Sequence, residues 1–229
     1  MAVTLPKGPT TNILAAITAL AFLPVQLMDE TDRAALLGGF IPVRVDALAA
    51  QGITVDVPWL PVWITPLTAT LIHAGWMHVI FNLMMLIFCG RHVEQLLGQG
   101  RTLLIYAIGA YAAAAGQWFV SSFFGGDQGS VIPMIGASGA ISALLGTYSM
   151  IYSQRGVQAF GPVPAYVVRM VWMALAWTGL QMMIAIAGGF DTLFGSVAIG
   201  AHIGGFLAGL VLARPLLKWR FRASKFLPK

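Results

Sequence analysis

Apolar residues occur along the chain in six long stretches, separated by shorter segments that hold most of the charged side chains. These stretches lie near residues 11–28, 75–91, 102–122, 138–153, 167–187 and 197–213. A helix needs about 20 mostly apolar residues to cross the hydrocarbon core of a bilayer. The pattern therefore predicts an all-α membrane protein with six transmembrane helices.

The fourth stretch is shorter than the others. From Ser138 to Ser153 it holds about 16 residues, or about 24 Å of helix, against a hydrocarbon core of about 30 Å. We expect part of the preceding loop, either 125–129 or 133–136, to descend below the membrane surface. Irregular backbone at that depth must line a water-filled cavity or be buried in protein. The sequence thus predicts a short fourth helix beside a water-accessible cavity.

The connection after the first stretch, roughly residues 29–74, is too long for a simple turn. Trp59 and Trp63 lie within it, separated by proline, and Trp76 follows it. Tryptophan is enriched at the level of the lipid headgroups. This long first loop is either a re-entrant or surface-lying hairpin or an ordinary ordered loop.

The amino-acid composition also indicates that the protein is surrounded by lipid. Of the 229 residues, 58% are hydrophobic and 9% are charged, and the mean hydropathy is +0.81. Soluble domains carry about 25% charged residues. We therefore expect one compact membrane domain over residues 1–229, in contact with the lipid bilayer.

The net charge of +5 is not spread as a nucleic-acid surface would require, so no nucleic-acid partner is expected. Six basic residues directly follow the last stretch, in a tail over residues 214–229 that is typical of a juxtamembrane anchor facing anionic lipid. They are Arg214, Lys218, Arg220, Arg222, Lys225 and Lys229.

Basic residues also set the orientation, because they are enriched in cytoplasmic loops. If the N-terminus is cytoplasmic, Arg33 and Arg44 are the only basic residues of the sequence that fall in outer segments. The inner segments then hold the basic tail and Lys7, Arg91, Arg101, Arg155 and Arg169. The chain is expected to be a multi-pass protein of the cell (plasma or inner) membrane with both termini cytoplasmic.

Two residues in these stretches carry candidate chemistry. Ser138 lies in Gly136-Ala137-Ser138-Gly139 at the start of the fourth stretch, and His202 lies in Ala201-His202-Ile203-Gly204-Gly205 within the sixth. Intramembrane ionisable residues are rare and usually functional. Neutral imidazole can remove the proton of a serine hydroxyl, so the two residue types fit a nucleophile and its base. Each also has a structural alternative, as a packing serine or a buried histidine.

Small residues beside Ser138 and His202 predict that the fourth and sixth helices approach closely enough for these two side chains to meet. Ser138, Ser142 and Gly146 repeat every four residues, and so do Ala201, Gly205 and Gly209. Such stripes let helix backbones approach closely in lipid. No carboxylate lies in any stretch to orient the histidine, which favours a Ser–His dyad over a triad.

Further donors are expected at the same depth, because the second, fourth and sixth helices all enter from the outer side. His78 and Asn82 are four residues apart and share a helix face. With the amide of Ser138, they could form an oxyanion hole. No His-Glu-x-x-His motif occurs, so no metal site is predicted.

Three blocks of the sequence resemble the rhomboid family of intramembrane serine proteases. They are His73-Ala74-Gly75-Trp76-Met77-His78-Val79-Ile80-Phe81-Asn82, the Gly136–Gly139 block with Gly146, and the Ala201–Gly205 block with Gly209. The resemblance implies a six-helix rhomboid-like bundle of the minimal bacterial type, with a site opening to the outer side. It also implies Ser138 as nucleophile, His202 as base and an oxyanion hole of His78, Asn82 and the Ser138 amide. The Trp-Arg pair usual in the family's first loop reads Ile64-Thr65 here.

The resemblance implies hydrolysis of peptide bonds in or near transmembrane segments of other membrane proteins, without a metal or organic cofactor. It also points to a substrate gate between the second and fifth helices, for which Phe81, Met85 and Trp177 are candidates. One alternative is a catalytically silent relative that binds membrane helices for degradation. Another is a small channel, although the inner halves of the stretches are almost wholly apolar. The sequence does not define an oligomeric state.

Overall fold

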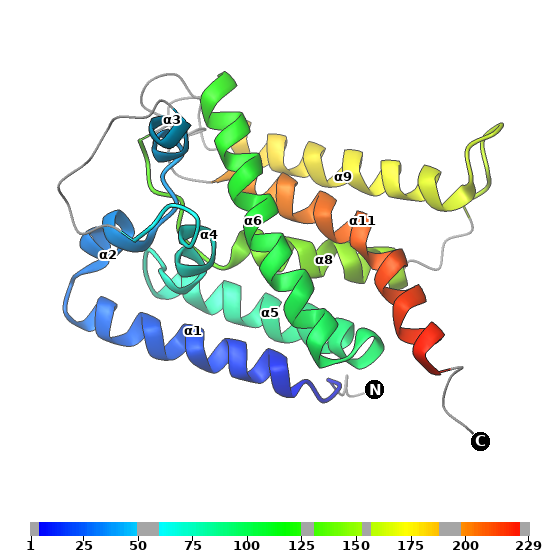
Figure 1. Cartoon of the computed structure of the whole chain (residues 1–229), viewed down its shortest axis with the longest axis horizontal. Coiled ribbons are helices and arrows are strands. Elements are labelled where there is room, and N and C mark those ends of the chain that lie inside the picture. Colours follow the sequence, from blue (N-terminus) through cyan, green and yellow to red (C-terminus); the bar gives the residue numbers. More distant parts are fainter. Residues whose placement is uncertain (1–4, 50–59, 125–130, 153–156, 188–197, 225–229) are drawn as a thin grey trace.

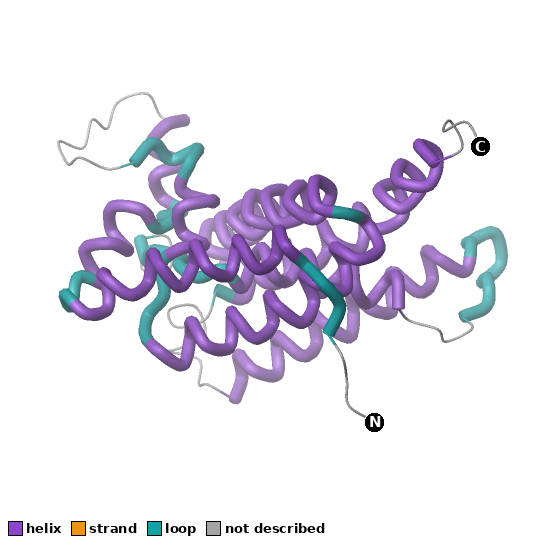
Figure 2. The backbone as a smooth tube through the Cα atoms, turned by 90° about the horizontal axis from the view of Figure 1, so that it is seen from below, coloured by secondary structure: helices purple, strands orange, loops and turns teal. Residues whose placement is uncertain are grey.

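The computed structural model describes residues 5–49, 60–124, 131–152, 157–187 and 198–224 (Figure 1). Within these ranges the chain is helical and contains no strand, only two isolated bridge contacts, Phe40 with Met134 and Phe160 with Val163. Figure 2 shows the helices joined by loops. The predicted all-α class is confirmed.

Among the residues that the structure describes, four helices are long and apolar enough to cross a membrane. They are α1 (Pro9–Leu27), α5 (Trp76–Leu97), α6 (Gln99–Phe124) and α11 (Ile199–Ser224). Two further helices match the other predicted stretches: α8 (Ser138–Tyr152) has 15 residues, and α9 (Ala165–Ala187) contains a shorter apolar run over Ala165–Leu180. The chain is a multi-pass membrane protein.

The helix ends differ from the prediction where polar side chains find partners inside the protein. The second stretch was expected to end at residue 91, but α5 continues to Leu97. Glu94 is buried, and its carboxylate accepts hydrogen bonds from the backbone N–H groups of Thr10 and Thr11 and from the Thr11 hydroxyl, at 2.7 to 2.9 Å. It thereby satisfies free donors at the start of α1. Likewise α11 runs beyond residue 213, through Pro215, to Ser224.

The long first loop contains short helices: α2 (Thr31–Gly38), α3 (Val43–Ala49), α4 (Thr65–Thr68) and the 3₁₀ turn η1 (Ala69–Leu71). Trp59 lies outside the described residues. Two hydrogen bonds hold the loop to α6, from Tyr111 Oη to the Trp63 carbonyl and from Trp118 Nε1 to Asp46 Oδ1. The described parts of this loop, residues 29–49 and 60–74, are therefore each attached to α6.

Helix α8 occupies the centre, between α5, α6 and α11 (Figure 1). Close backbone approaches join α8 to α11: a side-chain carbon at Gly205 would overlap the Gly139 carbonyl, and one at Gly209 would overlap the Ala143 carbonyl. Gly146 approaches the Phe206 carbonyl in the same way. Because small residues permit this approach, the first turns of α8 and α11 lie side by side. Helix α9 packs mainly against α11.

Candidate active site

Ser138 is the first residue of α8 and follows an irregular segment over residues 131–137. Gly136 has φ +108°, a left-handed conformation that only glycine adopts readily. Its N–H donates to the Ala69 carbonyl at 2.8 Å. A side chain there would also meet the His78 ring, so the glycine lets that ring approach the backbone leading into Ser138.

His202 lies in the first turn of α11 and reaches across to α8. Its Nε2 is 2.8 Å from Ser138 Oγ, a hydrogen-bond distance between residues 64 positions apart in the chain. When Nε2 is unprotonated, the serine hydroxyl donates to it, and the imidazole can then accept the serine proton. The structure thus brings together the two residues that the sequence analysis singled out.

His78 and Asn82 lie on α5, and the His78 ring faces Gly136. His78 Nδ1 accepts a hydrogen bond from the Ala74 N–H at 3.3 Å, so a neutral ring carries its proton on Nε2. A side-chain carbon at Gly136 would lie 2.7 Å from that Nε2 and 3.8 Å from Ser138 Oγ. His78 Nε2–H therefore faces Gly136, two residues before the serine.

The second predicted donor is occupied differently. Asn82 is buried, and its Nδ2 donates to the His78 carbonyl at 2.8 Å. Within the described part of the chain, its Oδ1 has no hydrogen-bond partner. One amide hydrogen of Asn82 thus bonds to the α5 backbone, and the amide nitrogen carries a second hydrogen.

His73 also belongs to this cluster, although it was not among the candidate site residues of the sequence analysis. Its side chain is 1% exposed, and its Nε2 accepts the Ala137 N–H at 3.4 Å. Its ring centroid lies 5.0 Å from that of His78. Burial, followed by repulsion from the His78 cation, lowers the pKa of His73 to about 4. Its position five residues before His78 was the available signal, but the sequence could not show that the loop turns back on Ala137.

A cavity of about 10 Å³ adjoins Ser138. Small side chains surround it, including Thr70, Ala113, Ala140 and Ala201. This volume is about what one water molecule occupies. The predicted cavity beside Ser138 is therefore small in this structure.

The three gate candidates do not form one contact surface. Phe81 is 53% exposed, whereas Met85 packs partly buried against the main apolar core. Trp177 faces α11: its ring stacks on Phe206 at 4.9 Å, and its Nε1 donates to the His202 carbonyl at 3.2 Å. Trp177 was expected to face the second helix, but its described contacts lie on the sixth.

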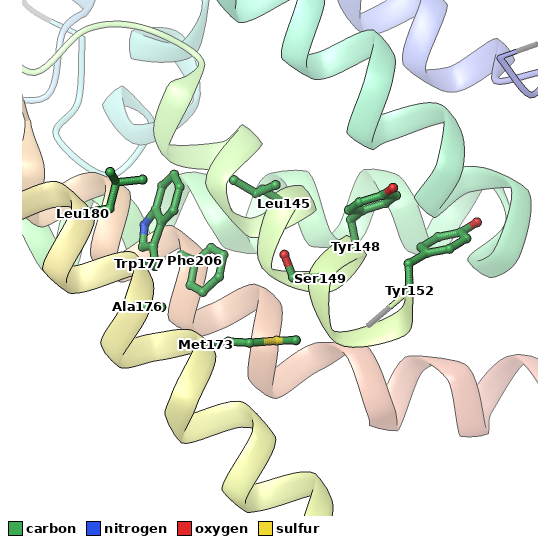
Figure 3. A pocket seen from close by; sticks show the side chains of 9 residues that line it. All are labelled: Leu145, Tyr148, Ser149, Tyr152, Met173, Ala176, Trp177, Leu180 and Phe206. Atoms are coloured by element: carbon green, nitrogen blue, oxygen red, sulfur yellow. The ribbon is translucent and has the colours of Figure 1, made fainter. Parts of the chain in front are cut away.

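Beside Trp177, a cavity of about 540 Å³ lies between α8, α9 and α11 (Figure 3). Trp177 and Phe206 form one part of its wall, and Tyr148, Ser149 and Tyr152 project from α8 along another part. Among the residues that the structure describes, no group of three His, Cys, Asp or Glu side chains could hold a metal ion.

Fold and site together define a multi-pass helical membrane protein with a serine and a histidine paired between two helices. The sequence model of the Rhomboid domain matches residues 61–219, a range that includes Ser138, His202, His78 and Asn82. This chain belongs to the rhomboid family, which confirms the resemblance drawn from the three sequence blocks.

Individual relatives carry the same family name. The chain is 31% identical over 144 residues to Rhomboid protease GlpG of Pectobacterium atrosepticum, covering 62% of this chain and 45% of the relative. It is 30% identical over 208 residues to Rhomboid protease GlpG of Salmonella typhimurium, covering 90% of this chain and 62% of the relative. The match thus spans less than two thirds of the length of these relatives.

Proposed function

We propose that this protein is an intramembrane serine endopeptidase that hydrolyses peptide bonds in or near transmembrane segments of other membrane proteins. The observation that carries the proposal is the 2.8 Å separation of Ser138 Oγ and His202 Nε2. Membership of the rhomboid family and similarity to proteins named Rhomboid protease GlpG support it.

The pair would act as a dyad. His202 Nε2 takes the proton of Ser138 Oγ as that oxygen attacks the substrate carbonyl carbon, and a tetrahedral intermediate forms. The imidazolium then protonates the leaving amine, the C–N bond breaks and an acyl-enzyme remains. Water, deprotonated by His202, attacks the ester, and the serine recovers its proton. Helices α8 and α11 contain no Asp or Glu to complete a triad.

The negative charge on the intermediate would be held by three donors. The Ser138 N–H is a free donor at the start of α8. His78 Nε2–H, which faces Gly136, would be the second donor, and the second amide hydrogen of Asn82 would be the third. His73 would act through the backbone, because its bond to the Ala137 N–H fixes the peptide that precedes the nucleophile.

The proposal includes a six-helix topology over one membrane domain, with both termini cytoplasmic and the site opening to the outer side. Support comes from the basic residues of the inner segments and from the described residues near each end of the chain: Gly8 approaches Arg91 on α5, and Arg220 approaches Gly98 at the turn between α5 and α6. Substrate helices would enter laterally from lipid between α5 and α9, with Phe81 and Met85 on α5 as the gate candidates.

Active-site labelling distinguishes the proposed protease from its rival, a catalytically silent relative that binds membrane helices. A fluorophosphonate should label the folded wild-type protein and Ser149→Ala, a control on the same helix, but neither Ser138→Ala nor His202→Ala. A folded wild-type protein that resists both the probe and turnover of model membrane substrates would favour the silent relative. Labelling that persists in Ser138→Ala would contradict the assigned nucleophile.

A further inference from the structure

Another cavity, of about 360 Å³, lies between the end of α8, the start of α9 and the second half of α11. Met150 on α8 contributes to its wall, about 18 Å along the helix from Ser138 at 1.5 Å per residue. The wall is mostly apolar, and two cations, Arg214 and Lys218, line it as well. This cavity is therefore separate from the candidate active site.

The two cations lie on one face of α11, because residues four apart are neighbours on a helix. The Arg214 guanidinium carbon lies 3.8 Å from the ring centroid of Tyr166, which holds it at the cavity. Helices α8, α9 and α11 carry no acidic residue. Within the described ranges, neither cation forms an ion pair with a carboxylate. The cavity thus holds two positive charges that the surrounding helices do not neutralise.

Arg220 lies on another face of α11 and contacts a different part of the protein. Arg220 approaches Gly98 at the turn between α5 and α6, and Arg101 lies 4.6 Å from the neighbouring Trp219 ring. These contacts attach the end of α11 to the helix bundle. Arg214, by contrast, contacts Tyr166 at the cavity, and Lys218 lines the same cavity one turn further along α11.

We propose that this cavity binds an anionic phospholipid. The phosphate would lie between Arg214 and Lys218, and an acyl chain would lie along Met150, Met170 and Val211. Charge complementarity selects the headgroup, because basic cavities between transmembrane helices attract anionic lipids. The apolar wall and the position within a candidate membrane span select a lipid over a free anion. The inference does not rest on the proposed protease activity.

Lipid binding to the full chain in uncharged detergent tests the proposal. Native mass spectrometry should show dioleoyl phosphatidylglycerol binding at least about tenfold more tightly than dioleoyl phosphatidylcholine, given two cations near the phosphate. The double variant Arg214→Gln/Lys218→Gln should lose most of this preference. Val211→Trp should weaken phosphatidylglycerol binding by filling the cavity, and because Val211 is 59% exposed, the change leaves the core intact.

The matched control is Lys7→Gln/Arg33→Gln, which removes two charges elsewhere and should keep the preference. Equal binding of the two lipids by the wild-type protein would overturn the proposal. So would an unchanged preference in the double variant, or an equal loss in the control, which would indicate a general charge effect. If inorganic phosphate alone competes fully and Val211→Trp binds normally, the cavity is a free-anion site and the lipid assignment fails.

Discussion

Trp177 on α9 donates its indole N–H to the carbonyl oxygen of His202 on α11, at 3.2 Å. The same indole stacks on Phe206, one turn further along α11. The fifth long helix is thus attached to the turn that carries the candidate base. Movement of α9 would therefore strain the backbone that positions the imidazole.

The dyad makes the sharpest prediction. Ser138→Ala and His202→Ala should each abolish cleavage of a model membrane substrate, and the double variant should be no worse than either, because each residue is ineffective without the other. Single-turnover assays on protein of verified fold measure this. Substantial proteolysis by either single variant would exclude the proposed mechanism.

The oxyanion assignment predicts a loss in turnover rather than in binding. His78→Ala should lower kcat by roughly 10²-fold or more, with a smaller change in KM, because the donor acts on the intermediate. Asn82→Ala should do the same through its second amide hydrogen. An increase in KM at constant kcat would instead make these residues substrate-binding or structural.

The gate hypothesis concerns Phe81, whose ring is 53% exposed on α5. Phe81→Ala should speed cleavage of a membrane-embedded substrate and leave a short soluble peptide less affected, because only the former must pass between helices. Thermal unfolding serves as the control and should change little, given the exposure. Equal effects on both substrates would remove the case for a gate at this position.

Glu94 should matter for stability and not for chemistry. Glu94→Ala removes the acceptor for three buried or part-buried donors at the start of α1, and should cost about 1–3 kcal/mol of unfolding free energy. Thermal unfolding in detergent measures the loss. Glu30→Ala is the matched control, since Glu30 is 42% exposed and pairs with Arg33 of the same helix region at 3.7 Å. Equal shifts in the two variants would contradict the capping role of Glu94.

We expect His73 to make the folding stability of the protein sensitive to acid. Its pKa in the folded protein is about 4, below the ordinary value of 6.5, so the unfolded chain binds the proton more readily. Its contribution to stability is therefore complete above about pH 6.5 and is lost as the pH falls towards 4, by at most about 1.4 kcal/mol per pH unit. His73→Asn should flatten the pH dependence of thermal unfolding in this window. A variant with the wild-type slope would place the acid sensitivity elsewhere.

The sequence by itself determined the helical class, the membrane solvent and the family, because these depend on the length and composition of local stretches and on short motifs. It also indicated Ser138 and His202, because such residues are rare in apolar stretches, and the small residues that recur every four positions beside them predicted that the two meet. A helical period fixes which residues share a face, and small side chains on that face allow a close crossing.

Contacts between distant segments were decided only by the tertiary structure. Glu94 extends α5 because its partners lie at the start of α1, and His73 joins the site because the first loop returns to Ala137. Trp177 faces α11 because the indole N–H finds the His202 carbonyl there. Each of these interactions pairs a polar group with a partner far along the chain, which a local pattern of apolar and polar residues does not encode.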